Sequence, residues 1–150
     1  MKRVVSSIYM ETHCHATEDI EKVEAAIMNM IPPSLRNEVK ISRDVLRGYY
    51  GNPIIVLRVE ILNSDHALMT AKFLSNLMTS HDRKRIRDTL ALRLNELKNL
   101  YIRVDKQQAY RGVARVAEHD DVIKVKVSIS LRTKNISEVK DVLKSIGLIE

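Results

Sequence analysis

Residues 122–131 alternate apolar and polar side chains from Ile123 onward, and this pattern constrains the fold more than any other in the chain. Such an alternation is typical of a β-strand that buries one face and exposes the other. The apolar residues share one parity along the segment: Ile123, Val125, Val127, Ile129 and Leu131. The chain is therefore expected to build a sheet in which several strands bury only one face.

Four further segments are predicted to be strands. Residues 99–105 should turn Tyr101 and Arg103 away from the core. Residues 54–62 are the most apolar segment and are expected to lie centrally, and the turn formers at 48–53 predict a hairpin that joins them to residues 38–47. Residues 3–14 alternate as well, and their buried parity is expected to be that of Val4, Ile8, Met10 and Cys14.

Helices are predicted over residues 18–31, 65–79, 81–97 and 136–146. Thr17 is expected to cap the first helix and Pro32-Pro33 to end it, while Asn135 and Gly147 bound the last one. A further helical turn is expected within 106–115. The order β-α-β-β-α-α-β-β-α predicts an α+β fold with one domain over residues 1–150, a mixed β-sheet and helices packed mainly on one face.

The net charge of +6 comes from one quarter of the chain. Residues 81–115 contain ten Lys/Arg and four Asp/Glu, whereas residues 1–80 contain nine of each and residues 116–150 six of each. Charge concentrated in this way produces a local field that attracts a polyanion, and nucleic acid is the commonest polyanion in a cell. The alternative is a solvated helix face whose charge imbalance has no functional meaning.

The candidate RNA-binding residues follow from this charge block. Four bases on the predicted helix 81–97 would contact phosphates, namely Arg83, Lys84, Arg85 and Arg87. Three later bases would extend the track: Arg103, Lys106 and Arg111. Tyr101 and Tyr110 would stack on bases, unless they only cover the sheet edge, and Lys124 and Lys126 would join if their strand lies beside 100–105. Arg93 falls within the apolar stripe and should either extend its charged end to solvent or pair with an acid such as Asp105.

Other chemistries find little support in the sequence. His13 and His15 share a face of their strand but Cys14 lies on the other, and no second cysteine completes a zinc site. The spacing supports no nucleophilic set and no Gly-rich phosphate loop, so we expect neither a metal nor a cofactor. Asp120-Asp121 is interpreted as a turn. A single cysteine fits a reducing cytoplasm, and no window approaches the roughly 18 apolar residues of a membrane span.

Several short segments resemble, in order, those of a small archaeal family described as predicted RNA-binding proteins or proposed exosome subunits. They are 15–19 (His-Ala-Thr-Glu-Asp), 51–53 (Gly-Asn-Pro), 103–110 (Arg-Val-Asp-Lys-Gln-Gln-Ala-Tyr) and 120–123 (Asp-Asp-Val-Ile). The resemblance covers residues 3–131, although members often carry His where this chain has Tyr49. It implies RNA binding and an α+β fold similar to that of large-subunit ribosomal protein five, and it carries over no catalytic residues.

We therefore expect a non-enzymatic, cytoplasmic RNA-binding protein, an accessory in RNA processing or exosome-type degradation. The first alternative is an assembly module, in which the basic residues dock an acidic partner subunit and the apolar hairpin forms a homodimer. The second is an RNA-modifying or hydrolytic enzyme, for which the sequence has no motif and which a deep pocket enclosing His13, His15 and a carboxylate would favour.

Overall fold

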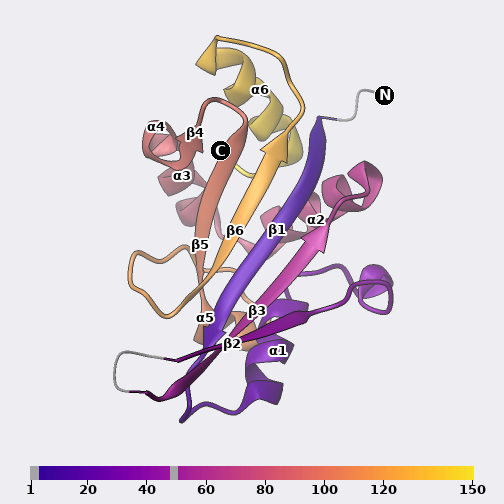
Figure 1. Cartoon of the computed structure of the whole chain (residues 1–150). Helices are drawn as coiled ribbons and strands as arrows, with labels where there is room; N and C mark the ends of the chain where they lie inside the picture. Colours follow the sequence, from indigo (N-terminus) through magenta and orange to yellow (C-terminus); the bar gives the residue numbers. More distant parts are fainter. Residues whose placement is uncertain (1–3, 48–50) are drawn as a thin grey trace.

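A six-stranded sheet forms the centre of the protein, as the computed structural model shows for residues 4–47 and 51–150 (Figure 1). The strand order is β2-β3-β1-β6-β5-β4, and each neighbouring pair is antiparallel. The expectation of a mixed sheet is therefore wrong. The strands are β1 (Val5–Cys14), β2 (Ser42–Arg47), β3 (Pro53–Ile61), β4 (Leu94–Asn95), β5 (Asn99–Asp105) and β6 (Val122–Ile129).

The predicted alternation is confirmed on β5 and β6, where every second residue is buried in one core. On β1 the parity changes near its start, because the pairing with β6 shifts register between Val5 and Ser7. Val5 is therefore buried and Val4 is not fully so, contrary to the expected parity. A bulge of this kind reverses the face on which the preceding side chains lie.

The predicted hairpin is confirmed as the pair β2–β3, which begins with Arg47 opposite Pro53. β3 lies inside the sheet between β2 and β1, whereas β2 is an edge strand whose residues are all exposed. Within the predicted turn, residues 48–50 lie outside the described residues, and Tyr49 is one of them.

All helices pack on the same face of the sheet, behind it in Figure 1. This confirms the expectation of helices on one face. The longer helices are α1 (Ile20–Met28), α2 (Ser64–Leu77), α3 (Ser80–Asp88) and α6 (Ile136–Ile146). The short ones are the 3₁₀ turn η1 (Pro33–Leu35), α4 (Leu90–Arg93) and α5 (Lys106–Tyr110).

The helix bounds differ most from expectation in the first and third helices, and α1 ends at Met28, before Pro32-Pro33. Asp19, not Thr17, caps α1 by accepting a hydrogen bond from the backbone N–H of Glu21. The predicted helix 81–97 ends at Asp88, because Thr89 leaves helical geometry with a φ of −111°. The Thr89 hydroxyl donates to the Arg85 carbonyl, and residues 94–95 then form the short strand β4.

In the part of the chain that the structure describes, the opposite face of the sheet carries no helix, and we call it the helix-free face (Figure 1). Its central residues are those of β1, β5 and β6 whose parity is opposite to the core. Within the described residues, no helix combines the length and apolar character needed to cross a bilayer.

Candidate nucleic-acid interface

Two tyrosines and a lysine form a row across the helix-free face. The strand register places Tyr101 of β5 opposite Lys126 of β6, and Lys126 opposite Tyr9 of β1. Because neighbouring strands lie about 4.8 Å apart, side chains at paired positions touch one another. The row therefore joins three strands that lie far apart in the sequence.

The two tyrosines differ in how much of the ring is free. Tyr101 is 43% exposed. Tyr9 is half-buried, and the Lys126 ammonium lies 5.4 Å from the centre of its ring, a cation–π distance. The Tyr9 hydroxyl donates to Glu11 Oε1 at 3.0 Å, and burial together with this carboxylate raises the pKa of Tyr9. Tyr101 thus offers the more open ring, with the charge of Lys126 beside it.

A second row lies next to the first and contains Arg103, Lys124 and Glu11. Burial opposes ionisation of Glu11, but hydrogen bonds from Arg58 and Tyr9 outweigh it and lower its pKa. Arg58 Nε lies 2.8 Å from Glu11 Oε1. Since Glu11 is already paired in this way, Lys124 and Lys126 have no carboxylate partner among residues 4–47 and 51–150.

Residues 118–121 (Glu-His-Asp-Asp), here called the acidic loop, form ion pairs with several of the bases that were expected to bind RNA. Arg85 and Arg93 both contact Glu118 at 2.9 Å. Arg103 donates to the His119 carbonyl at 2.7 Å and pairs with Asp120 at 3.1 Å. The alternative of a paired Arg93 is therefore right, but its partner is Glu118 and not Asp105.

The segment 103–107, the most specific part of the family resemblance, holds this loop in place. Asp105 contacts the His119 ring at 2.8 Å and caps α5 through the Gln108 N–H. Gln107 donates to Asp121 at 3.1 Å. Each polar side chain of this segment thus has a structural partner in the fold.

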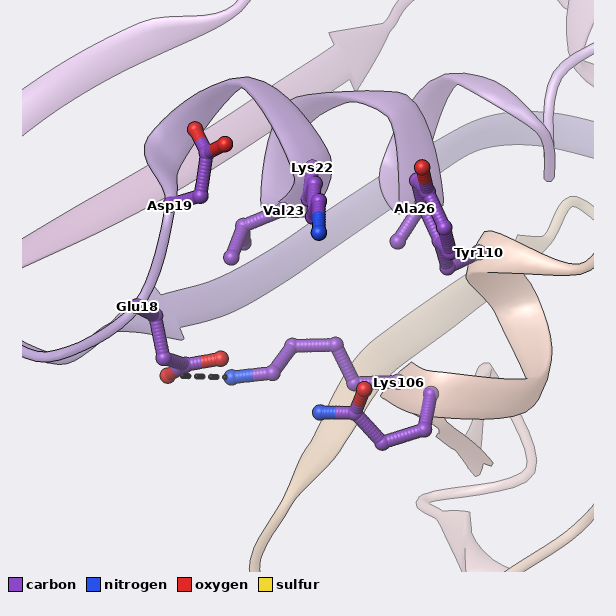
Figure 2. A pocket seen from close by; sticks show the side chains of 8 residues that line it. Glu18, Asp19, Lys22, Val23, Ala26, Lys106 and Tyr110 are labelled. Atoms are coloured by element: carbon purple, nitrogen blue, oxygen red, sulfur yellow. Dashed lines mark hydrogen bonds and ion pairs between the residues drawn. The ribbon is translucent and has the colours of Figure 1, made fainter.

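Lys106 is buried and forms internal ion pairs, so it is not a surface base. It is only 3% exposed, and its ammonium lies 2.9 Å from both Glu18 and Asp121 and 2.8 Å from the His13 carbonyl. Figure 2 shows it reaching Glu18 from α5 toward the start of α1. A phosphate could reach Lys106 only by breaking these contacts, so we remove it from the predicted interface.

The bases of α3 are also engaged by acids. Arg83 pairs with Glu150 at 3.0 Å, and Arg87 with Asp88 at 3.0 Å, whereas Lys84 is exposed. Seven of the ten bases in residues 81–115 have a carboxylate within 4 Å. The block therefore does not form one continuous free cationic surface, and this is the main difference from the sequence-based expectation.

Tyr110 and Arg111 lie away from the rows described above. Tyr110 belongs to α5 and lines a small pocket with α1 residues such as Lys22 and Ala26 (Figure 2). The Asn29 amide donates to its carbonyl at 3.1 Å. The fold thus separates Tyr110 from Tyr101, although both rings are similarly exposed.

The histidine pair lines a hollow at the end of β1, which we call the His13 hollow. It measures about 260 Å³, and the residues around it include His13, His15, Lys124, Arg103, Glu11 and Asp120. Cys14 points to the other side, where burial raises the pKa of its thiol. Within the described part of the chain, no three His, Cys, Asp or Glu residues are arranged to hold a metal ion.

Sequence reasoning missed Tyr9 and the acidic loop. Tyr9 has the outward parity of its strand, but the order of the strands was needed to place it beside Lys126. The partners of the basic residues come from Glu18, residues 118–121 and Glu150, and charge counts along the chain do not reveal such pairings.

Comparison with known proteins identifies the family to which this chain belongs. A family model described as RNA binding matches residues 7–129. RNA-binding protein PAB1135 of Pyrococcus abyssi is 36% identical over 124 residues, 82% of this chain and 80% of the relative. Uncharacterized protein MJ0213 of Methanocaldococcus jannaschii is 36% identical over 141 residues, 91% of this chain and 93% of the relative. The crystal structure of protein AF2318 from Archaeglobus fulgidus has a TM-score of 0.79 at 30% identity, covering 95% of this chain and 99% of that one. Since the model matches well over half of its residues, the chain belongs to the RNA binding family.

Proposed function

We propose that this protein binds single-stranded RNA, without catalysing a reaction, on the helix-free face of β1, β5 and β6. One observation carries the proposal: Tyr101, Lys126 and Tyr9 form a continuous row across three strands. An aromatic ring accepts a base by stacking, and a neighbouring ammonium neutralises its phosphate. Membership of the family and the name of the Pyrococcus relative support RNA as the ligand.

The helix-free face is a better candidate than the α3 surface because its charges are available. Lys124 and Lys126 lie beside an aromatic surface and have no carboxylate partner in the described ranges. Arg83, Arg85 and Arg87 would each have to leave an acid before they could bind a phosphate. Exchange of one ionic partner for another contributes less to binding than pairing of a free charge.

We also propose, from the family resemblance, an accessory role in RNA processing or exosome-type degradation in the cytoplasm. A small protein whose candidate RNA contacts lie on one open face of a sheet suits a subunit that presents RNA to an enzyme. The similarity to the fold of large-subunit ribosomal protein five likewise remains a prediction that rests on the family resemblance.

A second candidate function is assembly through the β2 edge. Val45 and Leu46 are 69% and 51% exposed on this strand, which has no neighbour on its outer side within the described sheet. Exposed apolar edge strands pair readily with another chain. Dimeric protein that binds no RNA would favour this function over the first.

The test is a salt titration of the affinity for a fluorescent oligouridine. For single strands, log K falls with log salt by about 0.7 per phosphate contact, so K124Q/K126Q should reduce the slope by about 1.4. The control K140Q/K144Q removes the same charge from exposed positions of α6 on the other side of the sheet. Equal slopes for the two double variants would refute the proposed interface.

A further inference from the structure

The His13 hollow lies at one end of the proposed RNA interface. It is formed where β1 leaves the sheet, beside β5 and β6, and it opens next to the row of Arg103, Lys124 and Glu11. A strand of RNA that follows the two rows in this direction would reach the hollow at its end. The hollow therefore belongs to the same face, but it offers a different kind of contact.

The hollow contains more hydrogen-bond donor groups than acceptor groups that could pair with them. Its two carboxylates are engaged already, Glu11 by Arg58 and Asp120 by Arg103. The side chains of His13, His15 and Lys124 have no hydrogen-bond or ion-pair partner among the residues that the structure describes. The guanidinium of Arg103 also lines the hollow, although it is already engaged by Asp120 and the His119 carbonyl.

The electrostatics agree with this count of donors. Burial is the main cause that lowers the pKa of His13; Lys124, His15 and Lys106 lower it further, and Glu11 opposes them. These three basic side chains line the hollow together with His13. An anion in the hollow would relieve this repulsion and form charge-assisted hydrogen bonds.

The size and charge of the hollow indicate which kind of anion it would bind. At about 260 Å³ it is smaller than the usual site of a drug-sized ligand, yet larger than a phosphate group needs. A phosphomonoester carries a charge of about −1.5 to −2 at neutral pH, more than the single charge of an internal phosphodiester. Building on the proposed function, we infer that the His13 hollow binds the phosphomonoester at one end of an RNA strand held on the helix-free face.

The experiment compares three oligouridines of one length and label with the full chain: 5′-phosphorylated, 3′-phosphorylated and hydroxyl at both ends. One of the two phosphorylated RNAs should bind about tenfold more tightly than the hydroxyl-ended RNA, as expected for one added charge-assisted hydrogen bond. Which RNA gains affinity identifies the end that lies in the hollow.

Two double variants separate the hollow from general effects of histidine loss. H13Q/H15Q should bring the ratio between phosphorylated and hydroxyl-ended RNA close to one. H66Q/H81Q changes two histidines of α2 and α3 and should keep the tenfold ratio. Circular dichroism checks that each variant is folded.

Each of the other outcomes contradicts either the inference about the hollow or the proposed RNA interface. Equal affinity of the wild type for all three RNAs would overturn the inference and leave the proposed interface intact. Absence of binding to every RNA would overturn both. Shortening of the RNA by the wild type but not by H13Q/H15Q would show that the two imidazoles act in catalysis, and a purely binding hollow would then be wrong.

Discussion

At the scale of single residues, two tyrosines offer a matched comparison. Tyr101 and Tyr110 are 43% and 45% exposed, but only Tyr101 lies in the row with Lys126. Stacking of a base on an aromatic ring contributes about 1–3 kcal/mol, so Y101A should weaken RNA binding by about tenfold or more. Y110A should leave the affinity within about twofold, since its ring faces the pocket beside α1. Fluorescence anisotropy measures both, and an equal loss in the two variants would contradict the assignment.

Lys106 shows why a residue type alone does not predict a role. In the sequence it is one base among ten, next to other bases and amides. In the fold it lies among three acceptors, two of them carboxylates that come from residues 18 and 121. Its aliphatic chain is buried and its charge is compensated, as is required for a charged group inside a protein. Only the tertiary structure separates such a lysine from one that contacts RNA.

At the scale of elements, the local patterns predict the structure well where one physical cause dominates. β5 and α6 have the predicted bounds, since the apolar period defines the strand and capping residues bound the helix. β6 begins where predicted but ends at Ile129, two residues early. The predicted helix 81–97 is interrupted at Thr89, resumes as α4 over Leu90–Arg93 and gives way to β4 at Leu94. Between β4 and β5, Glu96 and Leu97 adopt positive φ, which an apolar period cannot reveal.

The end of α6 allows a test of a single backbone position. Gly147 has a φ of 101°, and a Cβ there would lie 3.0 Å from Ser75 Oγ on α2. Gly112 also has a positive φ, 82°, but its Cβ would meet nothing within 4 Å. G112A should therefore cost about 1 kcal/mol of unfolding free energy from the backbone alone. G147A should cost more, because Ser75 must also move, and urea unfolding compares the two. Equal losses would show that the contact with Ser75 has no energetic weight.

At the scale of the whole molecule, the strand order determines the candidate site. β1 pairs with β6, and this brings Tyr9 next to residues more than a hundred positions away. The sequence predicts which face many side chains occupy, but not which strands are neighbours, since β1, β5 and β6 have similar alternations. The same long-range folding brings acids to the basic segment and leaves the free lysines on β6.

This network of long-range ion pairs predicts how the fold responds to acid. Burial opposes ionisation of Asp121, but hydrogen bonds from Lys106 and Gln107 outweigh it and lower its pKa below the ordinary value of 3.8. A carboxyl group with a lowered pKa in the folded state stabilises the protein above its unfolded pKa, and this contribution is lost as the pH falls through the folded value.

D121N should therefore be less stable than the wild type at pH 7, and the difference should shrink below about pH 4 as Asp121 takes up a proton. D141N removes an exposed carboxylate of α6 and should change the unfolding free energy by less than about 0.5 kcal/mol. Urea unfolding at a series of pH values measures these differences. A gap between D121N and the wild type that stays constant down to pH 2 would show that Asp121 stabilises the acidic loop by its shape and not by its charge. Shrinkage of the gap would instead show that Lys106, a base predicted to serve RNA, holds the molecule together through its charge.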